Sequence, residues 1–180
     1  MKKLILTVVL ALMPSLFFAQ TAFDKFDGQD DVTAVVVNKK MFKMMGDVKS
    51  KENQQYLNLI KKLDNLRVFT TQSTRVTSDM KATSEKYIKT AGLEELMRVT
   101  EKGQNIKILV KSGTSETNVK ELLMFIEGSG KNETVLMSLT GDFDLNDISM
   151  LTDKLNLPGG ANIDKAAKGS KGPKGPKGPK

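Results

Sequence analysis

The second half of the chain carries apolar residues with a period of two, which is the period of a β-strand. Residues 106–110 and 135–139 have this patterning, residues 93–99 alternate less cleanly, and residues 119–126 are apolar on both faces near their end. The separators between them contain Gly together with Ser or Asn, which are residues that tight turns prefer. Strands joined by such short turns pair with their neighbours along the chain, so the sequence predicts a four-stranded antiparallel meander.

The first half mixes β-branched runs with segments of helical periodicity. The predicted strands of this half are residues 32–37 and 66–71. The predicted helices of the whole chain are residues 39–45, 50–63, 77–91 and 145–155. Gly46 and Gly92 are expected to end the first and the third of these helices. Because a helical crossover usually joins parallel strands, the first two strands are expected to be parallel.

These elements follow the order β-α-α-β-α-β-β-β-β-α, which favours an α+β fold. We expect a mainly antiparallel sheet of about six strands with the helices packed on one face. The opposite face would then be open to a partner. Leu109 and Leu123 are out of phase with their inward neighbours and are expected to lie on that open face.

The chain divides into three parts of different composition. Residues 1–19 have a basic start and an apolar run of the length of a secretory signal peptide, and we expect them to be removed on export. Residues 20–164 are expected to form a single domain. Residues 165–180 repeat Lys, Gly and Pro and are predicted to be a disordered tail. No transmembrane segment is expected after signal cleavage, and the predicted location is the periplasm or outer envelope, with secretion as an alternative.

The composition excludes several kinds of chemistry. The chain has no His and no Cys, so it contains no Ser-His-Asp or Cys-His arrangement and no disulfide. It has no P-loop and no GxGxxG motif, and no cofactor is expected. The net charge of +7 belongs to the ends of the chain, because residues 4–164 hold 20 of the 28 basic residues and all 21 acidic residues. A nearly neutral domain lacks the basic surface that nucleic-acid binding requires.

Asp142, Asp144 and Asn146 form the sharpest local motif. They occupy positions one, three and five of a calcium-loop template, but the template's Gly and its final Glu are replaced by Asp147 and Asp153. The three residues are therefore weak candidates for a metal site. We favour a capping role in which Asp144 caps the last helix and Asp147 interacts with the start of that helix.

Two further sets of residues have alternative interpretations. Met41, Met44 and Met45 lie within about one helical turn, where soft sulfur ligands suit Cu(I), but we interpret them as core packing. The tail lysines are candidates for contact with an anionic lipid or polymer surface, and a solubilising tail without a partner is the alternative. These lysines are Lys165, Lys168, Lys171, Lys174, Lys177 and Lys180.

Several segments together resemble a known family. They are the signal end Leu-Phe-Phe-Ala-Gln, the strand-to-helix segment Val35–Phe42, residues 94–97 with 108–111, and residues 139–145 with Ile148. This set is similar to the small exported Bacteroidetes proteins called domain of unknown function 4252, over residues 20–157. The resemblance implies an envelope component and carries over no activity and no catalytic residue. The chain lacks the Cys of the family's lipoprotein members, and its tail lies outside the shared region.

We therefore expect a non-enzymatic envelope protein that works by contact with another envelope protein. The first alternative is a carrier of a small ligand or cation, with a pocket between sheet and helices. The second is an enzyme that uses carboxylates alone, which needs two acids in one cleft. The third is a surface-adhering protein whose basic tail supplies the affinity.

Overall fold

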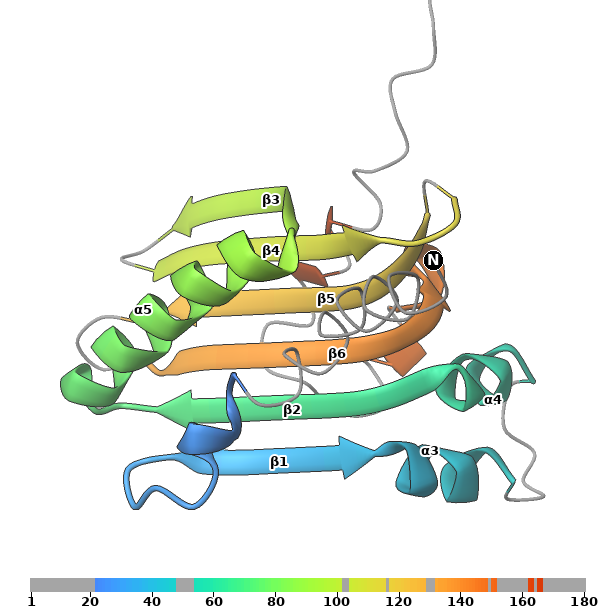
Figure 1. Cartoon of the computed structure of the whole chain (residues 1–180), viewed down its shortest axis with the longest axis horizontal. Coiled ribbons are helices and arrows are strands. Elements are labelled where there is room, and N and C mark those ends of the chain that lie inside the picture. The colour runs from blue at the N-terminus through green and yellow to red at the C-terminus, as the bar shows by residue number, and fades with distance from the viewer. Residues whose placement is uncertain are drawn as a thin grey trace, which may run out of the picture.

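The computed structural model of the chain describes residues 22–47, 54–101, 104–115, 117–128, 132–148, 150–151, 162–163 and 165–166. The predicted signal peptide lies outside these residues. A six-stranded sheet forms the centre of the described structure (Figure 1). Its strands are β1 (Thr33–Asn38), β2 (Leu63–Thr71), β3 (Glu94–Glu101), β4 (Gln104–Ser112), β5 (Asn118–Glu127) and β6 (Thr134–Asp144). The helices are α3 (Lys39–Gly46), α4 (Gln54–Lys61) and α5 (Thr74–Ala91), with 3-10 turns η2 (Asp24–Phe26) and η3 (Leu145–Asp147).

The strands follow the order β1-β2-β6-β5-β4-β3, and every neighbouring pair is antiparallel. The predicted meander is confirmed, since β3, β4, β5 and β6 pair in chain order. Strand β6 also pairs with β2, from Thr71↔Thr134 to Leu63↔Gly141. This long-range pairing joins the two halves of the chain into one sheet, and the α+β fold class is confirmed.

The expected parallel arrangement of the first two strands is wrong. Strands β1 and β2 pair antiparallel, from Thr33↔Thr70 to Asn38↔Asn65. The physical reason is helix length. Each of α3 and α4 has eight residues and is about 12 Å long, which is too short to run back along the nine-residue β2 of about 30 Å. The two helices therefore lie at one end of the strands (Figure 1), and the chain re-enters the sheet at the end it left.

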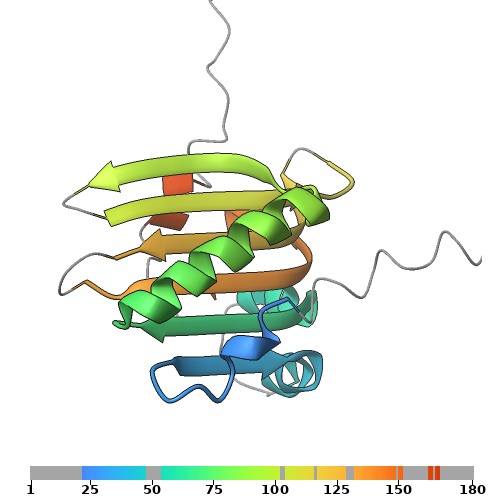
Figure 2. The ribbon, with the colours of Figure 1, turned by 60° about the vertical axis from the view of Figure 1, so that its left-hand side comes forward.

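Helix α5 shows the opposite case. Its 18 residues extend for about 27 Å, so it can cross the strands between β2 and the far edge strand β3, which runs in the same direction as β2. Figure 2 shows α5 lying diagonally across the strands. The helix ends where predicted, because Gly92 adopts the left-handed conformation with φ of 67°. It begins at Thr74, before the predicted start.

Both faces of the sheet are covered, so the expectation that helices pack on one face is wrong in this respect. On one face, Val76, Met80 and Tyr87 of α5 pack with the N-terminal turn residues Phe23 and Phe26. We call this the α5 face. On the other, which we call the α4 face, α4 packs with the chain that follows β6. The central strands account for this arrangement, since residues 121–126 and 134–139 are buried at every position.

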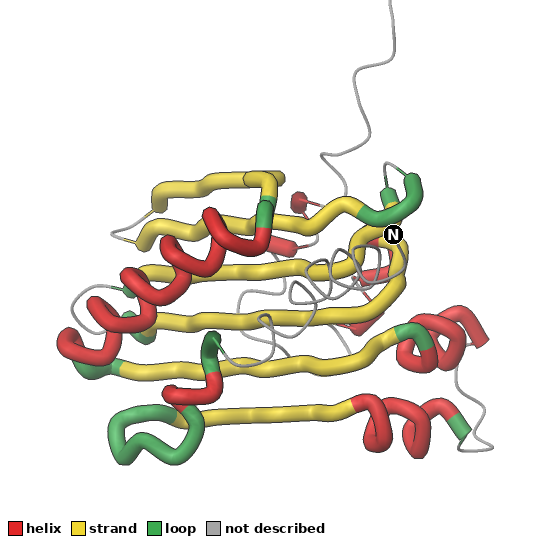
Figure 3. Tube along the Cα trace, in the orientation of Figure 1, coloured by secondary structure: helices red, strands yellow, loops and turns green. Residues whose placement is uncertain are grey.

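The C-terminal end of the described chain differs from the predicted tail boundary. Ile163 and Ala166 are 1% and 4% exposed and belong to the core of the α4 face. Residues 165–166 are helical, so the domain extends past residue 164. The helix predicted over 145–155 begins as the 3-10 turn η3 and is helical at the described residues 148 and 150–151, and its remaining residues lie outside the described ones. Figure 3 shows these short helical pieces in red.

Gly141 determines how closely β2 and β6 approach at the end of the sheet. A Cβ atom on this residue would lie 2.5 Å from the Lys62 carbonyl oxygen and 2.9 Å from the Leu63 Cα. Both atoms belong to backbone, which cannot rotate away. The β2–β6 pairing also shifts register between Leu63 and Asn65, so this contact coincides with an irregularity in the ladder.

We predict that Gly141→Ala lowers the free energy of unfolding by about 1–3 kcal/mol, because the added methyl group pushes two backbones apart. Urea unfolding monitored by circular dichroism measures this change. Thr140→Ala is the matched control on the same strand. Its buried hydroxyl has no hydrogen-bond partner among the described residues, so its removal should leave stability unchanged or raise it. Equal midpoints for Gly141→Ala and the wild type would contradict the close contact.

Candidate functional site

Four large apolar side chains are strongly exposed among the described residues, and all four lie on one continuous stretch of chain. Val35 and Val36 of β1 are 50% and 46% exposed, and Met41 and Met44 of α3 are 49% and 60% exposed. Strand β1 is an edge of the sheet, so its outer backbone groups have no neighbouring strand among the described residues. We call the stretch Thr33–Gly46 the β1 edge. It combines free backbone donors and acceptors with apolar side chains.

The local sequence explains why the methionines point outward. The Asn38 side chain caps α3 by accepting a hydrogen bond from the Met41 backbone N–H at 3.0 Å, so the helix begins directly where β1 ends. Phe42 is fully buried and anchors the helix, and Gly46 is buried as well. Met45 is half-buried against the core.

The interpretation of all three methionines as core packing is therefore wrong for Met41 and Met44. Helix α3 is only two turns long, and the side chain of Phe42 occupies the face that packs on the core. The two outer methionines are left to solvent, where flexible thioether side chains adapt to varied partners.

The predicted open face of the sheet is not open. Leu109 is 3% exposed and Leu123 is fully buried, and both lie beneath α5 with Phe125 and Leu136. Their neighbours along the strands belong to the core of the α4 face, whereas Leu109 and Leu123 belong to a second apolar core under α5. The apolar surface that the structure does expose lies at an edge of the sheet.

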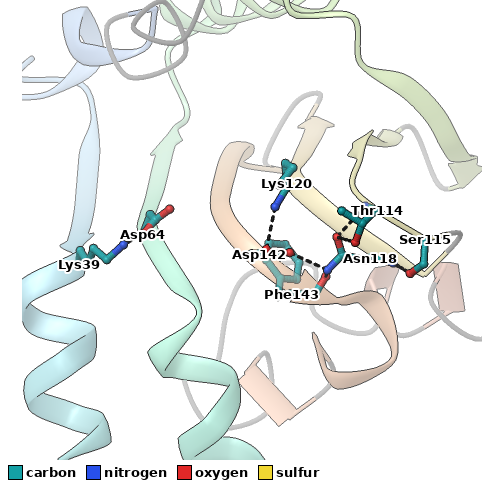
Figure 4. A network of polar contacts seen from close by, with 8 residues as sticks. All are labelled: Lys39, Asp64, Thr114, Ser115, Asn118, Lys120, Asp142 and Phe143. Atoms are coloured by element: carbon teal, nitrogen blue, oxygen red, sulfur yellow. Dashed lines mark hydrogen bonds and ion pairs between the residues drawn. The ribbon is translucent and has the colours of Figure 1, made fainter.

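A polar groove lies where the ends of β2, β5 and β6 meet the helices α3 and α4. It has a volume of about 400 Å³ and is lined by Lys39, Lys61, Lys62, Asp64, Asn118 and Asp142. Figure 4 shows the ion pair between Lys39 and Asp64, with Nζ and Oδ1 2.5 Å apart. Its lining residues come from the ends of the strands and from α3 and α4.

Within and beside the groove, each aspartate is neutralised by a lysine, in the pairs Lys39–Asp64 and Lys120–Asp142. Lys120 lies 2.7 Å from Asp142, and the Asn118 amide also donates to that carboxylate (Figure 4). The hydrogen bond from Lys120 is the main reason that the pKa of Asp142 is held below its usual range.

The three residues of the calcium-like motif have separate roles in the structure. Asp142 is engaged by Lys120 and Asn118 at the surface. The Asp144 carboxylate caps η3 by accepting from the Asn146 backbone N–H at 2.8 Å, and it also accepts from the Thr117 hydroxyl. The predicted capping role of Asp144 is confirmed. Among the described residues, no group of three acidic, His or Cys side chains gathers as a metal site would require.

One buried acid was missed by the sequence analysis. Glu121 on β5 is 3% exposed and lies under α5. It accepts a hydrogen bond from the Tyr87 hydroxyl at 2.7 Å and from the Ser138 hydroxyl at 3.3 Å. Burial raises the pKa of Glu121 more than these hydrogen bonds lower it, and burial beside this carboxylate also raises the pKa of Tyr87. Its phase gave no warning, since Glu121 alternates in step with Leu123, which the sequence analysis placed on the open face of the sheet.

We predict that Glu121→Gln stabilises the protein increasingly as the pH rises. In the unfolded protein the Glu121 carboxyl has a pKa near 4.5, whereas in the folded protein it keeps its proton to higher pH. The wild type therefore loses stability as the pH rises above 4.5. Glutamine has no such proton, and it can still accept from Tyr87 and donate to Ser138. Urea unfolding at about pH 4 and about pH 7 should show the variant gaining on the wild type.

Glu133→Gln is the matched control, because Glu133 is an exposed residue next to β6. Its stability relative to the wild type should change little over the same range. A Glu121→Gln variant that tracks the wild type at both pH values would contradict a buried Glu121 with a raised pKa.

The candidate tail contacts fall mostly beyond the described chain. Lys165 is exposed on a helical segment, and Lys168, Lys171, Lys174, Lys177 and Lys180 lie outside the described residues. None of the described helices combines the length and the apolar character needed to cross a membrane.

Comparison with known proteins identifies one family. The family model described as "Domain of unknown function (DUF4252)" matches residues 26–151, which include every strand of the sheet and the helices α3, α4 and α5. No curated protein and no solved structure matches the chain.

Proposed function

We propose, from the premise that this chain belongs to the DUF4252 family, that it is a non-catalytic protein–protein interaction module of the bacterial envelope. The β1 edge is the docking surface in this proposal. The observation that carries it is the gathering of all four exposed large apolar side chains of the described chain on this one stretch.

The chemistry of the edge suits a partner that is a protein. An edge strand offers a row of backbone donors and acceptors that another extended chain can pair with, and side chains on alternate faces add apolar contact. Flexible methionines are frequent at surfaces that bind proteins. In the β1 edge, Val35 and Val36 lie on the strand, and Met41 and Met44 extend the apolar surface beyond its end.

The charges around the other candidate surface favour a non-catalytic role. The acids of the polar groove, Asp64 and Asp142, each form an ion pair with a lysine. Glu121, whose pKa is raised, is buried under α5 and is not among the residues that line the groove. An enzyme that used carboxylates alone would need two such groups in one accessible cleft.

We place the protein in the periplasm or at the outer envelope, on the basis of the predicted signal peptide at residues 1–19. In this location the lysine tail would add affinity for an anionic surface, at about 1 kcal/mol for each lysine near it. Docking by the β1 edge and adhesion by the tail use different parts of the chain, so they can be tested separately.

We predict that a photo-crosslinking amino acid at position 44 captures a discrete partner in the native envelope, because Met44 is the most exposed of the four apolar residues. The measurement is the mass of the adducts after irradiation of intact cells. Ala82 is the control position, since it is an exposed residue of α5 away from the β1 edge.

An adduct of defined mass from position 44 that position 82 does not give would support the docking surface. The same adducts from both positions, or none from either, would contradict it. Removal of residues 167–180 should leave the adduct from position 44 in place, because the tail is not part of the β1 edge.

A further inference from the structure

We propose that the partner at the β1 edge is a second copy of this chain, joined by antiparallel pairing of the two β1 strands. This inference rests on the proposed docking function and names its occupant. Two six-stranded sheets would become one continuous sheet across a twofold axis, with the same residues contributed by each copy. The α5 face of both copies would lie on the same side.

The β1 strand has the features of an edge that pairs. Its six residues, Thr-Ala-Val-Val-Val-Asn, contain no charge, no Pro and no Gly. Its ladder with β2 runs from Thr33 to Asn38 without a register shift, so the strand is regular along its whole length. Such a strand presents evenly spaced backbone groups on its outer side.

The opposite edge of the same sheet is protected against pairing. Strand β3 carries the exposed charged residues Glu94, Glu95 and Arg98, and the last two form an ion pair. Its ladder with β4 shifts register between Glu95 and Met97. Charge and a bulge are two devices that keep edge strands from associating. The molecule protects β3 by both devices and leaves β1 without either.

The charges that flank β1 favour a second copy over other partners. The strand is preceded by the exposed acids Asp30 and Asp31 and followed by the exposed lysines Lys39 and Lys40. In an antiparallel pair of two identical strands, the acidic end of one copy meets the basic end of the other. In a pairing centred on Val35, the turn that holds Asp30 and Asp31 in one copy would come beside the first turn of α3, with Lys39 and Lys40, in the other, twice in each dimer.

The methionines of α3 fit the same arrangement. Helix α3 continues from the end of β1 (Figure 1), so in an antiparallel pair it would lie beside the start of the other copy's β1. Met41 and Met44 would then extend the apolar contact beyond the paired strands. This addition matters because a six-residue strand pair alone buries less surface than stable dimers usually need.

The first experiment measures the mass of the protein, purified from cells that express the full gene, by sedimentation at increasing concentration. We expect the average mass to rise toward twice that of one chain. Val35→Lys places two like charges opposite each other at the twofold axis and should weaken association by about ten-fold or more. Thr100→Lys adds the same charge to the exposed face of β3 and should leave association unchanged.

A charge exchange then tests the identity and direction of the partner. Lys39 already pairs with Asp64, so the exchange uses Asp30→Lys in one chain and Lys40→Glu in another. Each variant alone sets like charges opposite each other and should associate at least about three-fold more weakly than wild type at low salt. Mixing the two restores opposite charges at both ends, and the heterodimer should form with an affinity close to that of the wild type.

Wild-type protein that stays monomeric at every concentration would overturn the self-pairing, as would a dimer that Val35→Lys leaves intact or a mixture that fails to restore association. These failures are distinct from failure of the docking function. A defined adduct from position 44 whose added mass differs from that of one chain would retain the docking surface and replace its occupant.

Discussion

The pairing of β2 with β6 is the interaction on which the rest of the structure depends. It joins the first pair of strands to β6, the last strand of the meander, so that β6 and β5 become the two central strands of the sheet. Each of these strands is buried at six consecutive positions, which requires apolar cover on both faces of the sheet. Helix α5 with the N-terminal turn supplies one cover, and α4 with the chain after β6 supplies the other.

Because both faces of the sheet are covered, its two edge strands remain open to contact with other molecules. The two edges of this sheet differ in kind: β3 carries charges and a bulge, whereas β1 is regular, uncharged and flanked by acids at one end and lysines at the other. Self-pairing of β1 follows from this difference, because it satisfies the free backbone groups, the exposed valines and both sets of flanking charges at once.

Much of the fold could be predicted from the sequence, because local periodicity determines the type of each element. The meander, the helix stop at Gly92 and the cap at Asp144 all depend on residues close together in the chain. The direction of β2 relative to β1 depends instead on whether a helix is long enough to cross the sheet, a comparison of lengths that periodicity alone does not make. The cover on the α5 face was missed because Leu109 and Leu123 were interpreted as an exposed docking face. Apolar residues in both phases indicate instead a strand that is buried on both sides.

The site was harder to predict than the fold. Its methionines were assigned to the core, because Met41 and Phe42 suit the same helical pattern and only packing decides which of them points inward. Glu121 was missed for a related reason, since a single acid in phase with buried residues is recognised only once the helix above it is placed. In both cases the information lies in contacts between segments far apart in the sequence.

The most direct measurement of the central claim is hydrogen–deuterium exchange of the β1 amides at low and high protein concentration. The account predicts that the outward-facing amides of Thr33–Asn38 become protected as concentration rises, while the protection of the β3 edge does not change. Free exchange of these β1 amides at every concentration would contradict the claim that this edge pairs with a second copy.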